Sequence, residues 1–167
     1  PERGCWFLVR RVAATHRGVH PATDFLAGTE AYGVIARPID DATFSVAWNE
    51  FDFDEFLFAT GDMSHWLICD KEQATQMTGY NCQKCITMSH SSQEPYTVKW
   101  MQRRGNIEDP WISFADHFAD NFQTMLYGEN SCHKRNLTKG HLHLQQSHNG
   151  LNVWIRKRRY KTKSARK

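Results

Sequence analysis

Glu55–Cys69 reads EFLFATGDMSHWLIC, and this stretch decides the fold class. It contains two short runs rich in aromatic and branched apolar residues, Glu55–Thr60 and His65–Cys69, and such runs are typical of β-strands. The letters ATGD between them place Gly61 where the backbone must turn, with a polar side chain next to it. The stretch therefore predicts two strands joined by a tight turn.

Similar runs recur along the rest of the chain and are separated by turn signals such as RRGN, YGEN and HNG. Many short strands at near-regular spacing favour a sandwich or barrel. Alternation of apolar and polar residues favours antiparallel sheets with one solvated face each. We expect a mostly β protein, an antiparallel β-sandwich or jelly-roll-like fold. The further predicted strands are Trp6–Val12, Thr43–Trp48, Lys84–Met88, Tyr96–Gln102, His141–Gln145 and Leu151–Arg156.

One segment departs from the strand pattern. In PWISFADHFADNFQTML the apolar residues follow helical spacing, which predicts a helix near residues 113–124. Ser113 followed by Asp116 resembles an N-terminal capping pair, with Asp in place of the usual Glu or Gln. A second, shorter helix is predicted at Asp70–Met77. The fold should thus contain one or two short helices.

The chain has 167 residues, the length of about one domain, and no apolar run long enough to span a membrane as a helix. Because it opens with Pro1 and not with Met, we expect a processed product or a segment of a longer chain. The only boundary that we predict lies near Arg156. It separates a β-rich domain, 1–155, from a basic C-terminal extension, 156–167.

The net charge of +3 is the sum of two parts with opposite charge. Without the extension, 13 basic and 18 acidic residues remain, so the body carries a charge near −5. A segment this dense in positive charge is predicted to bind a polyanion: nucleic acid, an acidic surface or a neighbouring copy. The alternative is a solvated end that only aids solubility. The basic residues of the extension are Arg156, Lys157, Arg158, Arg159, Lys161, Lys163, Arg166 and Lys167.

Five cysteines are present, including a C-x-x-C at Cys82 and Cys85. Two thiolates at this spacing can bind zinc, and Cys69 with His90 could complete four ligands. Disulfides, plain thiols and redox chemistry are the alternatives. A glycosylation sequon at Asn136 adds support for an extracellular or particle-surface location.

Several polar residues fall at predicted strand or helix ends, where binding groups usually lie. His141 and His143 share one face of a predicted strand, as two metal ligands or simply as its solvated side. Trp66, Trp111 and Tyr127 either stack on a sugar ring or fill the core. No cofactor is predicted, although loop carboxylates leave Ca²⁺ as an alternative to Zn²⁺. The candidate ligand-binding residues are Asp62, Asp109, Asp116, His117, Glu129 and Asn130.

Read together, GCWFLVRRV, HPATDFLAGTEAYG, EFLFATGDMSHWLI, EDPWISFADH, LYGENS and NGLNVWIR resemble an extracellular β-rich module of algae, protists and marine invertebrates. The resemblance covers roughly residues 4–156 and implies a fold unit without an assigned activity. The C-x-x-C and the basic extension depart from that pattern. The opening WFLVRRV also resembles fibrinogen-C-like lectin domains, but the later cysteine and calcium signatures of that family do not follow.

The sequence contains no G-x-S-x-G elbow, Walker loop or H-E-x-x-H. We therefore expect a non-catalytic recognition or assembly module that contacts a glycan or a protein through its body and an acidic partner through its extension. One alternative is a structural subunit of a capsid or ribonucleoprotein, with the extension on nucleic acid or on a neighbouring subunit. Another is a metal-dependent hydrolase that uses His141, His143 and a loop carboxylate.

Overall fold

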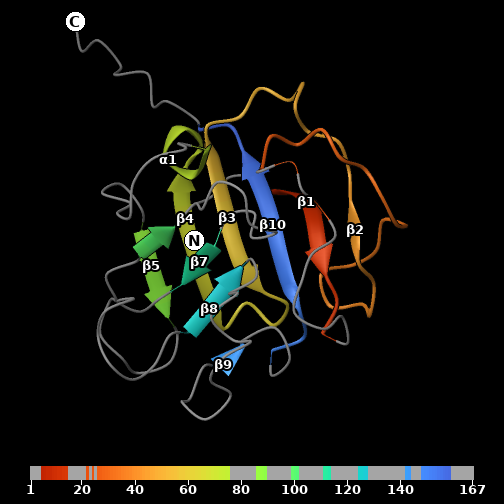
Figure 1. Ribbon diagram of the computed structural model, residues 1–167, viewed down its shortest axis with the longest axis vertical. Helices are drawn as coiled ribbons and strands as arrows, with labels where there is room; N and C mark the ends of the chain where they lie inside the picture. The colour runs from red at the N-terminus through yellow and green to blue at the C-terminus, as the bar shows by residue number, and fades with distance from the viewer. Residues whose placement is uncertain are drawn as a thin grey trace, which may run out of the picture.

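Over the residues that it describes, the computed structural model is mostly β and forms two sheets (Figure 1). It describes residues 5–14, 22, 24, 26–75, 86–89, 99–101, 111–113, 124–127, 142–143 and 148–158. The first sheet has six antiparallel strands in the order β2-β1-β10-β3-β4-β5, and the second has the order β6-β7-β8-β9. The second sheet is antiparallel except that β8 and β9 run parallel.

Each of the eight strands expected from the sequence overlaps a strand of the structure, and the two strands at Trp111–Ser113 and Thr124–Tyr127 were not expected. The six-stranded sheet consists of β1 (Phe7–Val12), β2 (Phe44–Ser45), β3 (Glu55–Thr60), β4 (His65–Asp70), β5 (Ile86–Ser89) and β10 (Leu151–Arg156). The smaller sheet consists of β6 (Lys99–Met101), β7 (Trp111–Ser113), β8 (Thr124–Tyr127) and β9 (Leu142–His143).

The two predicted helices have different outcomes. A five-residue helix, α1 (Lys71–Thr75), lies within the range expected at 70–77. At the range expected near 113–124, both end residues belong to strands, Ser113 to β7 and Thr124 to β8. Residues 114–123 between them lie outside the described residues.

The expectation that each sheet has one solvated face is wrong for β3. All six of its residues are buried, because β3 lies between β10 and β4 and apolar side chains cover both of its faces. Phe56 and Phe58 stack in one cluster with their ring centroids 5.6 Å apart. Leu57 and Ala59 belong to a second cluster on the other face. Alternation in β3 is therefore between two apolar faces.

Two buried arginines in β1 fasten the segment that precedes β3, Arg10 through Asp24 and Arg11 through the backbone carbonyl of Asp40. Arg10 is fully buried and donates to the carboxylate of Asp24 at 2.9 and 3.0 Å, and its guanidinium lies 4.5 Å from the centre of the Trp48 ring. Burying such a charge is tolerated because it is paired and hydrogen-bonded. Gly28, at φ +75°, leaves room for Trp48, since a Cβ there would lie 2.5 Å from the indole. These contacts hold the loops that lead to β2 and β3 against the sheet.

The two sheets contact each other where β8 meets β3. Figure 1 shows β8 lying across the β3 region of the larger sheet. The end of β3, its turn into β4 and the start of β10 lie at one edge of the large sheet, and this edge carries the first candidate site.

Candidate functional site

A polar cluster occupies the turn between β3 and β4. Asp62 Oδ1 accepts hydrogen bonds from the hydroxyl of Thr60 at 2.7 Å and from the hydroxyl and backbone N–H of Ser64 at 2.6 and 3.0 Å. Its other oxygen, Oδ2, lies 2.8 Å from Nδ1 of His148. Because an ionised carboxylate only accepts, Nδ1 of His148 must carry the proton of this bond. We call Thr60, Asp62, Ser64, His65 and His148 the turn cluster.

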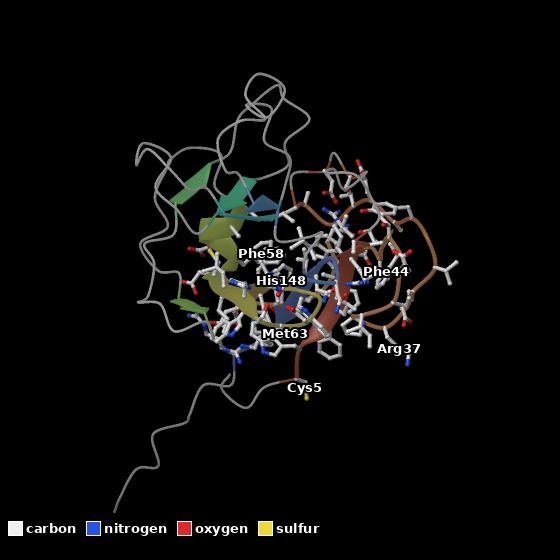
Figure 2. All side chains as sticks on the ribbon, turned by 90° about the horizontal axis from the view of Figure 1, so that it is seen from below. Cys5, Arg37, Phe44, Phe58, Met63 and His148 are labelled. Carbon is white, nitrogen blue, oxygen red and sulfur yellow. The ribbon has the colours of Figure 1, made fainter. Side chains whose placement is uncertain are left out.

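His148 comes from the distant turn before β10, and the backbone holds the two turns together. The N–H of Gly61 donates to the carbonyl of Gly150 at 2.8 Å, and the N–H of Asp62 donates to the carbonyl of His148 at 3.2 Å. A Cβ on Gly61 would lie 1.9 Å from the carbonyl oxygen of Asn149, so this close approach requires glycine. Figure 2 shows His148 well inside the set of drawn side chains, near the middle of the view.

These bonds set the charge state of the cluster. Burial alone would raise the pKa of Asp62, but the hydrogen bonds from Ser64, Thr60 and His148 outweigh it and hold that pKa well below its usual range. The pKa of His65 is lowered, chiefly by burial and then by the neighbouring His148. Asp62 is therefore a charged group whose oxygens are already occupied by donors from the same chain.

The arrangement positions side chains and does not form a proton relay. In nucleophilic catalysis an imidazole bonds the nucleophile through one nitrogen and the carboxylate through the other. Here Ser64 Oγ and Asp62 Oδ2 both meet the same nitrogen, Nδ1 of His148, at 3.0 and 2.8 Å. Ser64 Oγ also lies 2.9 Å from Nδ1 of His65, and the two imidazole rings are 4.7 Å apart at 62°. The cluster thus fixes two histidine rings at the edge of the sheet.

Of the six residues predicted to bind a ligand, only Asp62 is described. Its Oδ1 accepts three hydrogen bonds from Thr60 and Ser64, and its Oδ2 orients the ring of His148. Sequence reasoning missed Ser64, His65 and His148 as its partners. The available signal was that both TGD and HNG mark turns, but nothing in the sequence placed those turns side by side. Asp109, Asp116, His117, Glu129 and Asn130 lie outside the described residues.

The predicted zinc ligand Cys69 belongs to the hydrophobic core. It lies in β4 at 1% exposure, and burial raises the pKa of its thiol to about 12. A zinc ligand must be a thiolate, and this environment opposes that form. Within the described ranges no three His, Cys, Asp or Glu side chains are grouped to hold a metal ion. Cys82, Cys85, His90, His141 and the sequon at Asn136 lie outside those ranges.

Trp66 is a core residue at 5% exposure, so of the two roles that the sequence left open it has the interior one. It packs with Leu57 and Ile68 on the face of β3 and β4 opposite Phe56, and the partly buried Trp6 and Trp154 pack against that group. No helix in the part of the chain that the structure describes has the length and apolar character of a membrane span.

A second candidate site lies where β10 ends. Arg156 is the last residue of β10, as in the strand predicted at Leu151–Arg156, and its side chain is only 9% exposed. Its Nε donates to Glu55 Oε2 at 2.5 Å, and its guanidinium lies 4.3 Å from the centre of the Trp6 ring. Arg156 was predicted to bind a polyanion, but the structure commits its charge to the core of the sheet.

The next two basic residues are also paired with carboxylates of the body. Lys157 Nζ donates to Oδ1 of Asp52 at 2.6 Å and to Oδ1 of Asp54 at 3.1 Å. Arg158 Nε donates to Glu55 Oε1 at 2.7 Å, and its guanidinium also pairs with Asp70. We call the four carboxylates Asp52, Asp54, Glu55 and Asp70 the acidic rim. Arg159, Lys161, Lys163, Arg166 and Lys167 lie outside the described residues.

The contacts at the rim shift the pKa values of Lys157 and Asp54 in opposite directions. The hydrogen bonds to Asp52 and Asp54 raise the pKa of Lys157. Burial alone would raise the pKa of Asp54, but the backbone N–H of Arg158 and the ammonium of Lys157 outweigh it and lower that pKa. Lys157 and Asp54 thus each favour the charged form of the other.

No protein-family profile, curated protein or solved structure matches the chain.

Proposed function

We propose that the protein is a non-catalytic recognition and assembly module at a cell or particle surface. Its β body would contact a glycan or a protein, and its basic extension would dock on an acidic partner. The observation that carries the proposal is the attachment of the extension: Arg156, Lys157 and Arg158 are bound to the acidic rim. The point at which the extension joins the body is therefore fixed, as a recognition arm requires. From here, "basic arm" means residues 157–167.

The body provides a rigid attachment point for that arm. The contact between β8 and β3, together with apolar clusters on both faces of β3, supports a two-layer arrangement, and we propose a β-sandwich. Arg156 ends a strand whose neighbours on both sides, β1 and β3, belong to the same sheet. A rigid origin lowers the ordering cost that the arm would otherwise incur on binding.

The turn cluster supports a binding surface on the body. Its histidine rings are oriented by hydrogen bonds from fixed backbone turns, and the side chain of His148 is 28% exposed. Pre-oriented polar groups at loop ends are common in recognition sites. The shared use of Nδ1 by Ser64 and Asp62 favours positioning over acyl-transfer chemistry.

A glycan array combined with pull-down tests the proposal. The full chain would be compared with a variant in which Lys161, Lys163, Arg166 and Lys167 are replaced by glutamine. We expect the full chain to capture an acidic partner and the variant to lose it, while any glycan bound by the body is retained by both. Turnover of a small substrate by both proteins, with no binding by either, would show that the proposal is wrong.

A further inference from the structure

The acidic rim already occupies the root of the basic arm. Lys157 bridges Asp52 and Asp54, and Arg158 meets Glu55, Asp70 and, through its backbone N–H, Asp54 at 2.9 Å. Any external anion that uses Lys157 or Arg158 must therefore displace a carboxylate of the same chain. The rim is an internal competitor, present at high effective concentration because both partners belong to one body.

Burial divides these contacts into a fixed part and an exchangeable part. Arg156 and Glu55 are 9% and 7% exposed at their side chains, so their pair forms part of the interior. Lys157 and Asp52 are 49% and 82% exposed, and their pair faces solvent. Solvent-exposed pairs are weak, each changing an equilibrium by about fivefold at most. Lys157 can thus leave the rim for a stronger anion, whereas Arg156 stays.

The chemistry of the competitor indicates which anion is strong enough. An acidic protein surface offers the arm carboxylates like those of the rim. Unlike the rim, that surface is not part of the same chain, so it lacks the rim's high effective concentration. A nucleic-acid strand offers a line of phosphates with condensed counterions, and their release favours binding in a way that scattered carboxylates do not match. Arginine and lysine both bind phosphate well, and the arm contains both.

We propose that the acidic rim gates the basic arm, so that the arm accepts a nucleic-acid strand and rejects ordinary acidic protein surfaces. This inference rests on the proposed function, because it assumes that the arm is a recognition element. It adds that the partner is a nucleic-acid strand, and that competition from the rim carboxylates sets the affinity of the arm for that strand. Rejection of wrong partners through a competing contact is a general route to specificity.

Fluorescence anisotropy with a labelled 20-nucleotide single-stranded oligothymidine and a labelled 20-residue polyglutamate tests the gate. The rim variant is Asp52→Asn with Asp54→Asn in the full chain. The matched control is Glu50→Gln with Glu72→Gln, which removes the same charge from two exposed residues near the rim. Asp52→Asn alone serves as a second variant, since a side chain 82% exposed can be changed without disturbing the fold.

We expect the full chain to bind the oligonucleotide and not the polyglutamate. The rim variant should bind the oligonucleotide about 3- to 10-fold more tightly at low salt. Its slope of log affinity against log salt should steepen by about 0.7, the contribution of one more single-strand phosphate neutralised. The single variant should give part of this gain, and the control should stay within about twofold of the full chain.

Three results would overturn the inference. If the rim variant binds as the control does, the rim is no competitor, although the proposed function stands. If polyglutamate binds as tightly as the oligonucleotide, the partner class is wrong while the arm remains a recognition element. If the four-residue arm variant binds both probes as the full chain does, the proposed function fails as well.

Discussion

Replacing Glu55 by glutamine should destabilise the whole domain, because Glu55 is the anion that balances the buried Arg156. Their side chains are 7% and 9% exposed, with Arg156 Nε and Glu55 Oε2 at 2.5 Å. Removing one partner of a buried pair leaves an uncompensated charge and typically costs about 3–5 kcal/mol. Glutamine keeps one oxygen acceptor, and Arg156 keeps its contact with the Trp6 ring. We therefore expect about 3 kcal/mol.

Urea unfolding followed by fluorescence and circular dichroism measures this loss, and thermal unfolding should show a decrease of about 6–12 °C for a chain of this length. The exposed Glu50→Gln is the matched control and should change the free energy of unfolding by less than about 0.5 kcal/mol. A double-mutant cycle with Arg156→Gln should show that the two losses are not additive. A loss below about 1 kcal/mol for Glu55→Gln would refute the reasoning, because it would mean that Arg156 does not depend on this carboxylate.

Three further predictions concern other parts of the body. Gly28→Ala should cost about 1–3 kcal/mol in thermal unfolding, because its Cβ would lie 2.5 Å from Trp48 at a φ of +75°; an unchanged melting temperature would contradict this packing. Asp62→Asn should cost about 1–2 kcal/mol at pH 7. Since the folded pKa of Asp62 lies below its unfolded value, its stabilisation is complete above about pH 4 and is lost as the pH falls further, so urea midpoints of wild type and variant should converge toward pH 2. Iodoacetamide at pH 8 should alkylate the exposed Cys5 in the native protein but Cys69 only in urea, as mass spectrometry of the peptides would show; rapid native labelling of Cys69 would contradict its burial.

The strands could be predicted because their signal is local. Runs such as EFLFAT and LNVWIR are short, apolar and rich in residues that favour strands, and both form strands with the predicted bounds. The sheet order could not be predicted in the same way. β10 lies between β1 and β3, so its neighbours are about 140 and 100 residues away along the chain, and no local pattern encodes such a pairing.

The same limit explains what was missed in the turn cluster. Asp62 and His148 are 86 residues apart in sequence and meet only because β3 and β10 are adjacent. Gly61 was correctly placed in a turn, but its closeness to the carbonyl of Asn149 depends on that adjacency. Local sequence thus predicted the turns, while the pairing of strands determined which side chains they bring together.

The basic run shows a different limit. Charge density alone suggested that the arm separates from the body at Arg156. In the structure, the strand formed by LNVWIR continues through Arg156. Glu55 on β3 pairs with Arg156 and Arg158, and Asp70 on β4 pairs with Arg158. Buried arginines illustrate a related point, since Arg10 is retained in the interior by the carboxylate of Asp24, and Arg11 by the oxygens of Asp40 and Asn152 that accept its hydrogen bonds.

The most direct test of the account is the salt dependence of oligonucleotide binding by the full chain. Between 50 and 200 mM salt, an arm that neutralises about five single-strand phosphates should lose roughly a hundredfold in affinity. The variant with glutamine at Lys161, Lys163, Arg166 and Lys167 should bind weakly at both concentrations. Equal affinity at the two salt concentrations, or unchanged binding by that variant, would contradict the claim that the basic arm recognises a nucleic-acid strand.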